Sequence, residues 1–227
     1  LLFVLLETEQ NPSLPHYTEQ FMRLLVDLPH AIKAQLKVGV QQLFDKISPA
    51  IPFPDFQTPV TDSQTRKVML LGDVLINLGN EVEMCKCLDS FPGAAAPDTP
   101  KVPIWRKTIE AKMKETYPTG LYLGPRGSVQ SQASAPGNKK IQWRVRIGAH
   151  TDELYDDPGW LRWPNLKKFY DLTTLETDNF TPYGGMVYVE TPESATADNP
   201  ETGLVNIKNG LAVPLYDVRD GQEAKTK

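Results

Sequence analysis

The sequence predicts an α+β protein, with a helical N-terminal half followed by an antiparallel β-sandwich. Up to about residue 90, apolar residues recur at steps of three and four, the period of an amphipathic helix. Beyond residue 103 they fall mainly in short alternating runs between turn signals, the pattern of strands in a sandwich. Residues 91–103, FPGAAAPDTPKVP, lie between the two patterns and read as a linker of small residues and prolines.

Length and charge restrict the function classes. A chain of 227 residues can bury one sizeable core or two small ones without disulfides. The formal net charge of −4 gives no electrostatic reason to expect nucleic acid as a partner. The apolar run LLFVLL at the start is too short for a signal peptide or a membrane span. We therefore expect no nucleic-acid partner, no transmembrane segment and a cytoplasmic location, at the plasma membrane only through a partner.

The N-terminal half divides into a short strand and a helical region. Residues 1–14 begin with the run LLFVLL, which we interpret as a buried strand at the end of a preceding domain. Residues 15–90 form the predicted helical region. Its longest apolar stripe, in TDSQTRKVMLLGDVLINLGNEVEMCKCLDS, indicates a helix of roughly five or six turns that begins with capping residues.

Residues 104–227 form the predicted β-sandwich region. We expect one short helix over IWRKTIEAKMKET and then strands in TGLYLG, KIQWRVRIGAH, KKFYDLTTLE, GGMVYVETP, GLVNIKNG and LAVPLYDV. Turn signals separate these runs at Pro136-Gly137, Asp178-Asn179 and Gly184-Gly185.

The stretch RIGAHTDELYDDPGW, residues 146–160, concentrates ionisable residues in a chain with three histidines. A zinc peptidase would need a glutamate directly after the first histidine and a second histidine one helical turn along, and HTDEL has neither of them in place. The oxygen-rich DELYDD also lacks the spaced pattern that wraps calcium, and Asp and Gly favour surface turns. Nucleophile elbows and phosphate-binding loops do not occur in the chain. We predict no catalytic or metal-binding residue, and a hydrogen bond between His150 and Asp152 within the turn.

Four aromatic residues near this stretch are candidate glycan or partner contacts: Trp143, Tyr155, Trp160 and Trp163. Sugars stack on exposed aromatic faces, so these residues could form a carbohydrate platform. The alternative, which we favour, is that they fill the sandwich core or cover its open end. The glycosylation pattern at Asn179-Phe180-Thr181 is discounted because Pro182 follows it.

Several linked motifs carry a resemblance to a known family. TGLYLGPRGSV, WRVRIGAHTDELYDDPGWLRWPNL, TPYGGMVYVETP and GLVNIKNGLAVPLYDV resemble, in order and spacing, the region preceding the metal site in enhancin-like, mucin-targeting zinc metallopeptidases. The resemblance covers roughly residues 117–220. It implies a fold-forming role for the signature residues Gly120, Leu121, Tyr122, Leu123, Gly148, Ala149, His150, Thr151, Asp152, Trp160, Gly184 and Gly185. The chain departs from the family pattern at Gly124-Pro125-Arg126-Gly127, where Pro-Ala-Gly is frequent.

The resemblance also implies where the chemistry would lie. The family's catalytic H-E-x-x-H is expected beyond this chain, so no catalytic residue is carried over, and no cofactor is expected here; zinc would belong to the full-length parent. Within the superfamily the chain is similar to the animal TRP channel-associated factors, which place helical segments ahead of the enhancin-like region.

Three functions follow as expectations. The first is a non-catalytic intracellular fragment that binds and regulates a membrane ion channel. The second is the substrate-presenting N-terminal part of a zinc metallopeptidase acting on glycoproteins, and the third is a carbohydrate-binding sandwich. An intact H-E-x-x-H in the parent sequence would favour the peptidase. Loss of this motif would favour the fragment that binds an ion channel.

Overall fold

The computed structural model describes residues 30–47, 58–77, 92–138, 141–213, 215–217 and 222–224. The chain divides into two compact units. The helical unit comprises Leu1–Cys87 and Leu154–Pro164, and the sandwich unit comprises Leu88–Glu153 and Asn165–Lys227. The predicted strand at residues 1–6, the predicted helical turns before residue 30 and the end of the long predicted helix lie outside the described residues.

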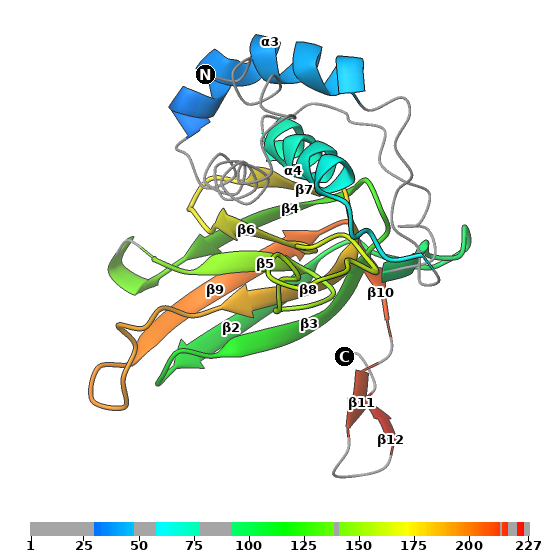
Figure 1. The fold of residues 1–227 in the computed structure, drawn as a ribbon. Coiled ribbons are helices and arrows are strands. Elements are labelled where there is room, and N and C mark those ends of the chain that lie inside the picture. The colour runs from blue at the N-terminus through cyan, green and yellow to red at the C-terminus, as the bar shows by residue number, and fades with distance from the viewer. Residues whose placement is uncertain are drawn as a thin grey trace. The chain divides into compact units, whose positions relative to one another are not determined.

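The helical unit contains α3 (His30–Ile47) and α4 (Ser63–Asn77), which pack against each other (Figure 1). Asp62 caps α4, because its Oδ1 accepts a hydrogen bond of 2.7 Å from the backbone N–H of Thr65. The capping residues predicted at this point are therefore confirmed. These two helices lie in the predicted helical region, but they do not establish a helical N-terminal half, since the remainder of that region is outside the described residues.

The second part of the helical unit, Leu154–Pro164, lies between two strands of the sandwich in sequence. Val60 and Trp160 form an antiparallel bridge with two backbone hydrogen bonds of 2.9 Å. The guanidinium of Arg66 on α4 donates to the carbonyls of Asp157 and Pro158, at 2.8 and 2.7 Å. We call residues 154–164 the strap segment. The strap segment groups with α4 in the helical unit.

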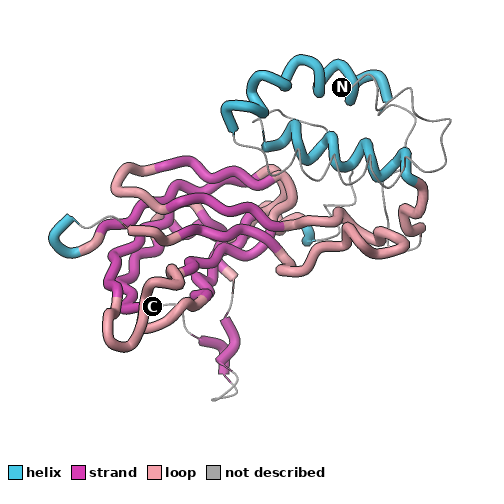
Figure 2. Tube along the Cα trace, turned by 60° about the vertical axis from the view of Figure 1, so that its left-hand side comes forward, coloured by secondary structure: helices cyan, strands magenta, loops and turns pink. Residues whose placement is uncertain are grey.

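The sandwich unit consists of two antiparallel sheets, whose strands are shown in magenta in Figure 2. The six-stranded sheet has the order β1 (Lys101–Val102), β10 (Gly210–Ala212), β3 (Thr116–Leu123), β8 (Gly185–Glu190), β5 (Arg144–Gly148) and β6 (Lys167–Asp171). The four-stranded sheet has the order β2 (Trp105–Ala111), β9 (Glu201–Lys208), β4 (Gly127–Ser134) and β7 (Thr177–Thr181). A separate hairpin pairs β11 (Leu215–Asp217) with β12 (Gln222–Ala224). The β-sandwich part of the predicted fold is therefore confirmed.

One core lies between the two sheets. Alternate residues of each central strand face inward, as the period of two requires. The six-stranded sheet contributes Leu121, Leu123, Val145, Ile147, Val187 and Val189, and the four-stranded sheet contributes Ile109, Ala111, Val129, Ala133, Val205 and Ile207. All are at most 3% exposed, so the residues between them in sequence form the outer faces.

Two sequence interpretations of this region are wrong. Residues 104–116 do not form a helix, because β2 pairs with β9 along its whole length and buries Ile109 and Ala111 on the inner face. This tertiary pairing outweighs the helical propensity of Lys107 and Glu110 within the strand. Asp178-Asn179 is not a turn but lies within β7. The strand β4 was not predicted, because its sequence GSVQSQAS is largely polar.

Candidate functional site

The outer face of the six-stranded sheet carries a cluster of arginine and aromatic side chains on β5, β6 and β8. The register places Phe169, Arg146 and Tyr188 side by side across the three strands. Two residues away on the same face, Arg144 of β5 lies directly opposite Glu190 of β8. We call these five residues the arginine cluster.

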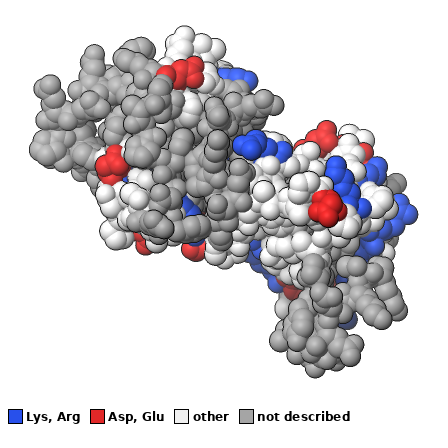
Figure 3. All heavy atoms as spheres, turned by 90° about the vertical axis from the view of Figure 1, so that its right-hand side faces the viewer, with Lys and Arg blue, Asp and Glu red and all other residues white. Residues whose placement is uncertain are grey.

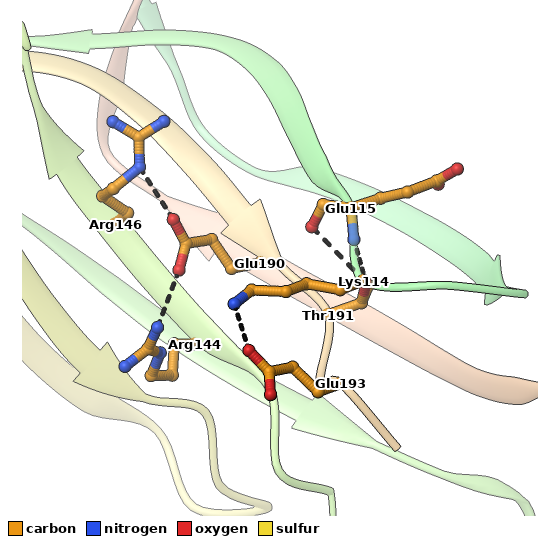
Figure 4. A network of polar contacts seen from close by, with 7 residues as sticks. All are labelled: Lys114, Glu115, Arg144, Arg146, Glu190, Thr191 and Glu193. Atoms are coloured by element: carbon orange, nitrogen blue, oxygen red, sulfur yellow. Dashed lines mark hydrogen bonds and ion pairs between the residues drawn. The ribbon is translucent and has the colours of Figure 1, made fainter. Parts of the chain in front are cut away.

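Glu190 joins the two arginines (Figure 4). Its Oε1 accepts a hydrogen bond of 2.9 Å from Nε of Arg146, and its Oε2 accepts one of 3.0 Å from the guanidinium of Arg144. The side chains differ in exposure: 8% for Arg146, 14% for Glu190 and 45% for Arg144. One carboxylate thus holds one buried and one half-exposed cation.

Aromatic rings support both guanidinium groups. The guanidinium carbon of Arg146 lies 4.1 Å from the ring centre of Tyr188, and that of Arg144 lies 4.6 Å from the ring centre of Phe169. Both distances are within the range of cation–π attraction. The Phe169 side chain remains 41% exposed. Arginine and aromatic residues held in fixed positions are typical of protein-binding surfaces.

A second ion pair lies beside the cluster (Figure 4). Lys114 contacts the carboxylate of Glu193 and holds the pKa of that carboxyl below its usual value. The backbone N–H of Glu115 donates 2.8 Å to the hydroxyl of Thr191, which in turn donates to the carbonyl of Met113. These bonds fix the chain just beyond the end of β8, next to Glu190.

We expect Glu190→Gln to lower the free energy of unfolding by about 2 kcal/mol, because neutral Gln replaces charge-assisted hydrogen bonds and leaves the buried Arg146 cation without a counter-ion. Urea unfolding followed by circular dichroism measures the change. Glu193→Gln is the matched control, since this carboxylate is 79% exposed and solvent screens its ion pair. A Glu190→Gln variant as stable as the control would contradict a structural role for the cluster.

The structure places the family-signature residues in three groups. Leu121 and Leu123 face the core, whereas Tyr122 faces outward and its hydroxyl donates 2.6 Å to the carbonyl of Gly93. Gly120 lies at a bulge in β3 with φ of +74°. These four positions therefore lie on β3, and the fold-forming role that the resemblance implies for them stays a prediction.

The glycines of the signature allow close strand contact. Gly148 at the end of β5 lies beside Gly185 at the start of β8, and both Gly184 and Gly185 have positive φ. A Cβ on Gly148 would lie 2.3 Å from the carbonyl oxygen of Leu166. Only glycine fits this arrangement.

The turn after β5 contains the other signature residues. Nδ1 of His150 lies 3.5 Å from Oδ1 of Asp152, at the outer limit of a hydrogen bond. The carbonyl of Thr151 accepts 2.7 Å from Nζ of Lys167, which also pairs with Glu153 at 2.9 Å. Among the described residues, no group of three or more His, Cys, Asp and Glu side chains could hold a metal ion.

The four candidate aromatic contacts are buried. Trp143 and Trp160 are 0% exposed, Trp163 is 1% exposed and Tyr155 is 7% exposed. A sugar platform requires exposed rings, so these side chains do not form one in this structure. Trp143 belongs to the sandwich core, whereas Trp160, Trp163 and Tyr155 belong to the strap segment.

The asparagine of the glycosylation pattern is also buried. Asn179 is 1% exposed and its amide group contacts the hydroxyl of Ser131 on β4. A folded chain therefore does not present this side chain for modification.

Charged side chains of both signs are interspersed over the described atoms visible in Figure 3. Neither described helix is long and apolar enough to cross a membrane.

Fold and site together define the class of this region: a two-sheet antiparallel β-sandwich with glycine-dependent strand contacts and an ordered arginine cluster. Within this class, residues 101–205 match the family model described as the N-terminal domain of M60-like peptidases. The match confirms the predicted resemblance to the enhancin-like metallopeptidases for these residues.

Two curated relatives are similar to the chain. TRPM8 channel-associated factor 3 of Rattus norvegicus is 30% identical over 98 residues, which are 43% of this chain and 10% of the relative. The Mus musculus protein of the same name is 29% identical over 125 residues, which are 55% of this chain and 13% of the relative. The matched segment thus spans only 10–13% of the relatives' length.

Solved structures that the chain is similar to include IMPa from Pseudomonas aeruginosa in complex with an O-glycopeptide. It is 16% identical with a TM-score of 0.48, over 96% of this chain and 26% of that chain. The catalytic module of the metalloprotease ZmpA from Clostridium perfringens is 10% identical with a TM-score of 0.35, over 51% of this chain and 26% of that chain.

Proposed function

We propose that the chain is a non-catalytic part of an intracellular protein resembling the TRP channel-associated factors, and that its sandwich binds and regulates a membrane ion channel. The arginine cluster is the observation that supports this function. Its exposed edge, formed by Arg144 and Phe169, combines a fixed cation with an apolar ring. Sequence similarity to TRPM8 channel-associated factor 3 suggests TRPM8 as the channel to test.

A co-precipitation experiment tests the proposal. The tagged chain, residues 1–227, is expressed in cells with TRPM8, and the recovered channel is quantified against an unrelated tagged protein. We expect recovery above that control, and about a tenfold loss for the double variant Arg144→Ala/Phe169→Ala, the size of effect typical of interface hot spots.

Phe180→Ala is the matched control. Phe180 is 36% exposed and lies on β7 of the other sheet, so the variant removes a similar ring from the opposite outer face. No recovery of TRPM8 above background would count against channel binding. Equal losses for the double variant and for Phe180→Ala would count against the arginine cluster as the contact.

The second candidate is a substrate-presenting part of a zinc metallopeptidase that acts on glycoproteins. The match of residues 101–205 to the N-terminal domain of M60-like peptidases supports it. Retention of the chain on immobilised mucin, combined with no recovery of TRPM8, would favour this function. An intact H-E-x-x-H in the parent sequence would favour it as well.

A further inference from the structure

A pocket of about 570 Å³ lies where β9 begins in the sandwich unit. Its lining includes Pro136 and Gly137 of the turn after β4, Ile141, and Pro200 and Glu201 at the start of β9. None of these residues belongs to the arginine cluster or to the family signature. Glu201 is the ionisable residue of this lining.

Two neutral donors fix the carboxylate of Glu201. The indole Nε1 of Trp143 donates 3.1 Å to Oε2, and the hydroxyl of Ser194 donates 2.7 Å to Oε1. Trp143 is fully buried, so its indole cannot reorient without disturbing the core. The carboxylate is therefore held in place by the fold.

The charge of Glu201 remains uncompensated within the described part of the chain. None of the ion pairs between described residues involves this carboxylate. A carboxylate offers about four lone-pair positions, and the indole and the hydroxyl occupy two of them. Two acceptor positions on a fixed anion thus remain for a cationic donor.

The wall of the pocket is preformed. Thr196 and Asn199 exchange two backbone hydrogen bonds of 3.2 Å, and the Thr196 hydroxyl accepts another from the Asn199 N–H at 3.1 Å. These bonds close the loop before Pro200. Pro136 and Pro200 of the lining add rigid apolar surface, against which the methylene stem of a long side chain can pack.

We propose that this pocket binds a lysine or arginine side chain of a protein partner. The ammonium or guanidinium group pairs with Glu201, and the aliphatic stem lies against Pro136 and Pro200. The site is independent of the arginine cluster, so its test does not depend on channel binding.

The test is an NMR titration of the ¹⁵N-labelled chain with acetyl-lysine methylamide. The reporter is the indole N–H of Trp143, since this group donates directly to Glu201. We expect a saturable shift of this signal, with a dissociation constant on the order of millimolar, as befits one solvent-accessible ion pair. The uncharged probe acetyl-norleucine methylamide, which has a similar stem, should bind at least tenfold more weakly.

Glu201→Gln keeps the shape of the side chain and should abolish saturation, whereas Glu193→Gln should not change it. Asn199→Lys places an amine at the exposed pocket rim, so it should also prevent binding of the probe while leaving the fold intact. No shift, equal shifts with the two probes, or unchanged binding in both pocket variants would overturn the proposal.

Discussion

Gly185→Ala is expected to lower the free energy of unfolding by about 3–5 kcal/mol, from backbone strain and overpacking together. The residue has φ of +124°, which L-residues with a side chain rarely adopt. A Cβ would also lie 2.4 Å from the carbonyl carbon and 2.6 Å from the Cα of Gly148. Because these are backbone atoms of the neighbouring strand, relief requires β5 and β8 to move apart. Urea unfolding measures the loss.

The variant Gly137→Ala separates the contribution of backbone strain from that of overpacking. Gly137 also has positive φ, +69°, but nothing lies within 4 Å of its Cβ position. We therefore expect a loss of only about 1–2 kcal/mol, from the left-handed conformation alone. Equal losses for the two variants would show that the contact between β5 and β8 does not require glycine.

The predicted strands with the clearest sequence pattern are β5 and β8, which have apolar inner faces. RVRIG in β5 and GMVYVE in β8 alternate clearly because every second residue enters the core. The strand β7, TDNFT, lacks the usual pattern of apolar residues facing inward and polar residues facing outward. Its inward positions include the buried polar residues Asn179 and Thr181. Its hydrogen bonds, such as that from Asn179 to Ser131, compensate for burial, but they depend on a partner 48 residues away.

The arginine cluster was partly visible in the sequence. The alternation that predicts β5 also places Arg144 and Arg146 on the face opposite the core. Their shared partner Glu190 was not predictable, because it depends on the register between β5 and β8. Similarly, the pattern WLRW indicates buried tryptophans but does not reveal that the strap segment belongs to the helical unit.

The second variant with a large expected loss of stability lies in the strap segment. Trp163 is 1% exposed, and the nearest atoms to the Cβ position of Gly72 on α4 are the rings of Trp163 and Phe44, at 3.5 Å. Glycine at position 72, which costs about 1 kcal/mol in a helix, therefore lies where two aromatic rings approach the helix closely.

We expect Trp163→Ala to lower the free energy of unfolding by about 3–5 kcal/mol, because it removes a large buried ring and leaves a cavity. Leu161→Ala is the control in the same segment; this side chain is 45% exposed, so its loss should stay within about 0.5 kcal/mol. Chemical denaturation followed by fluorescence of the remaining tryptophans measures both variants. If Trp163→Ala were as mild as Leu161→Ala, residues 154–164 would contribute little to the helical unit. A large loss for Trp163→Ala alone would instead mean that the helical unit depends on residues supplied from between β5 and β6.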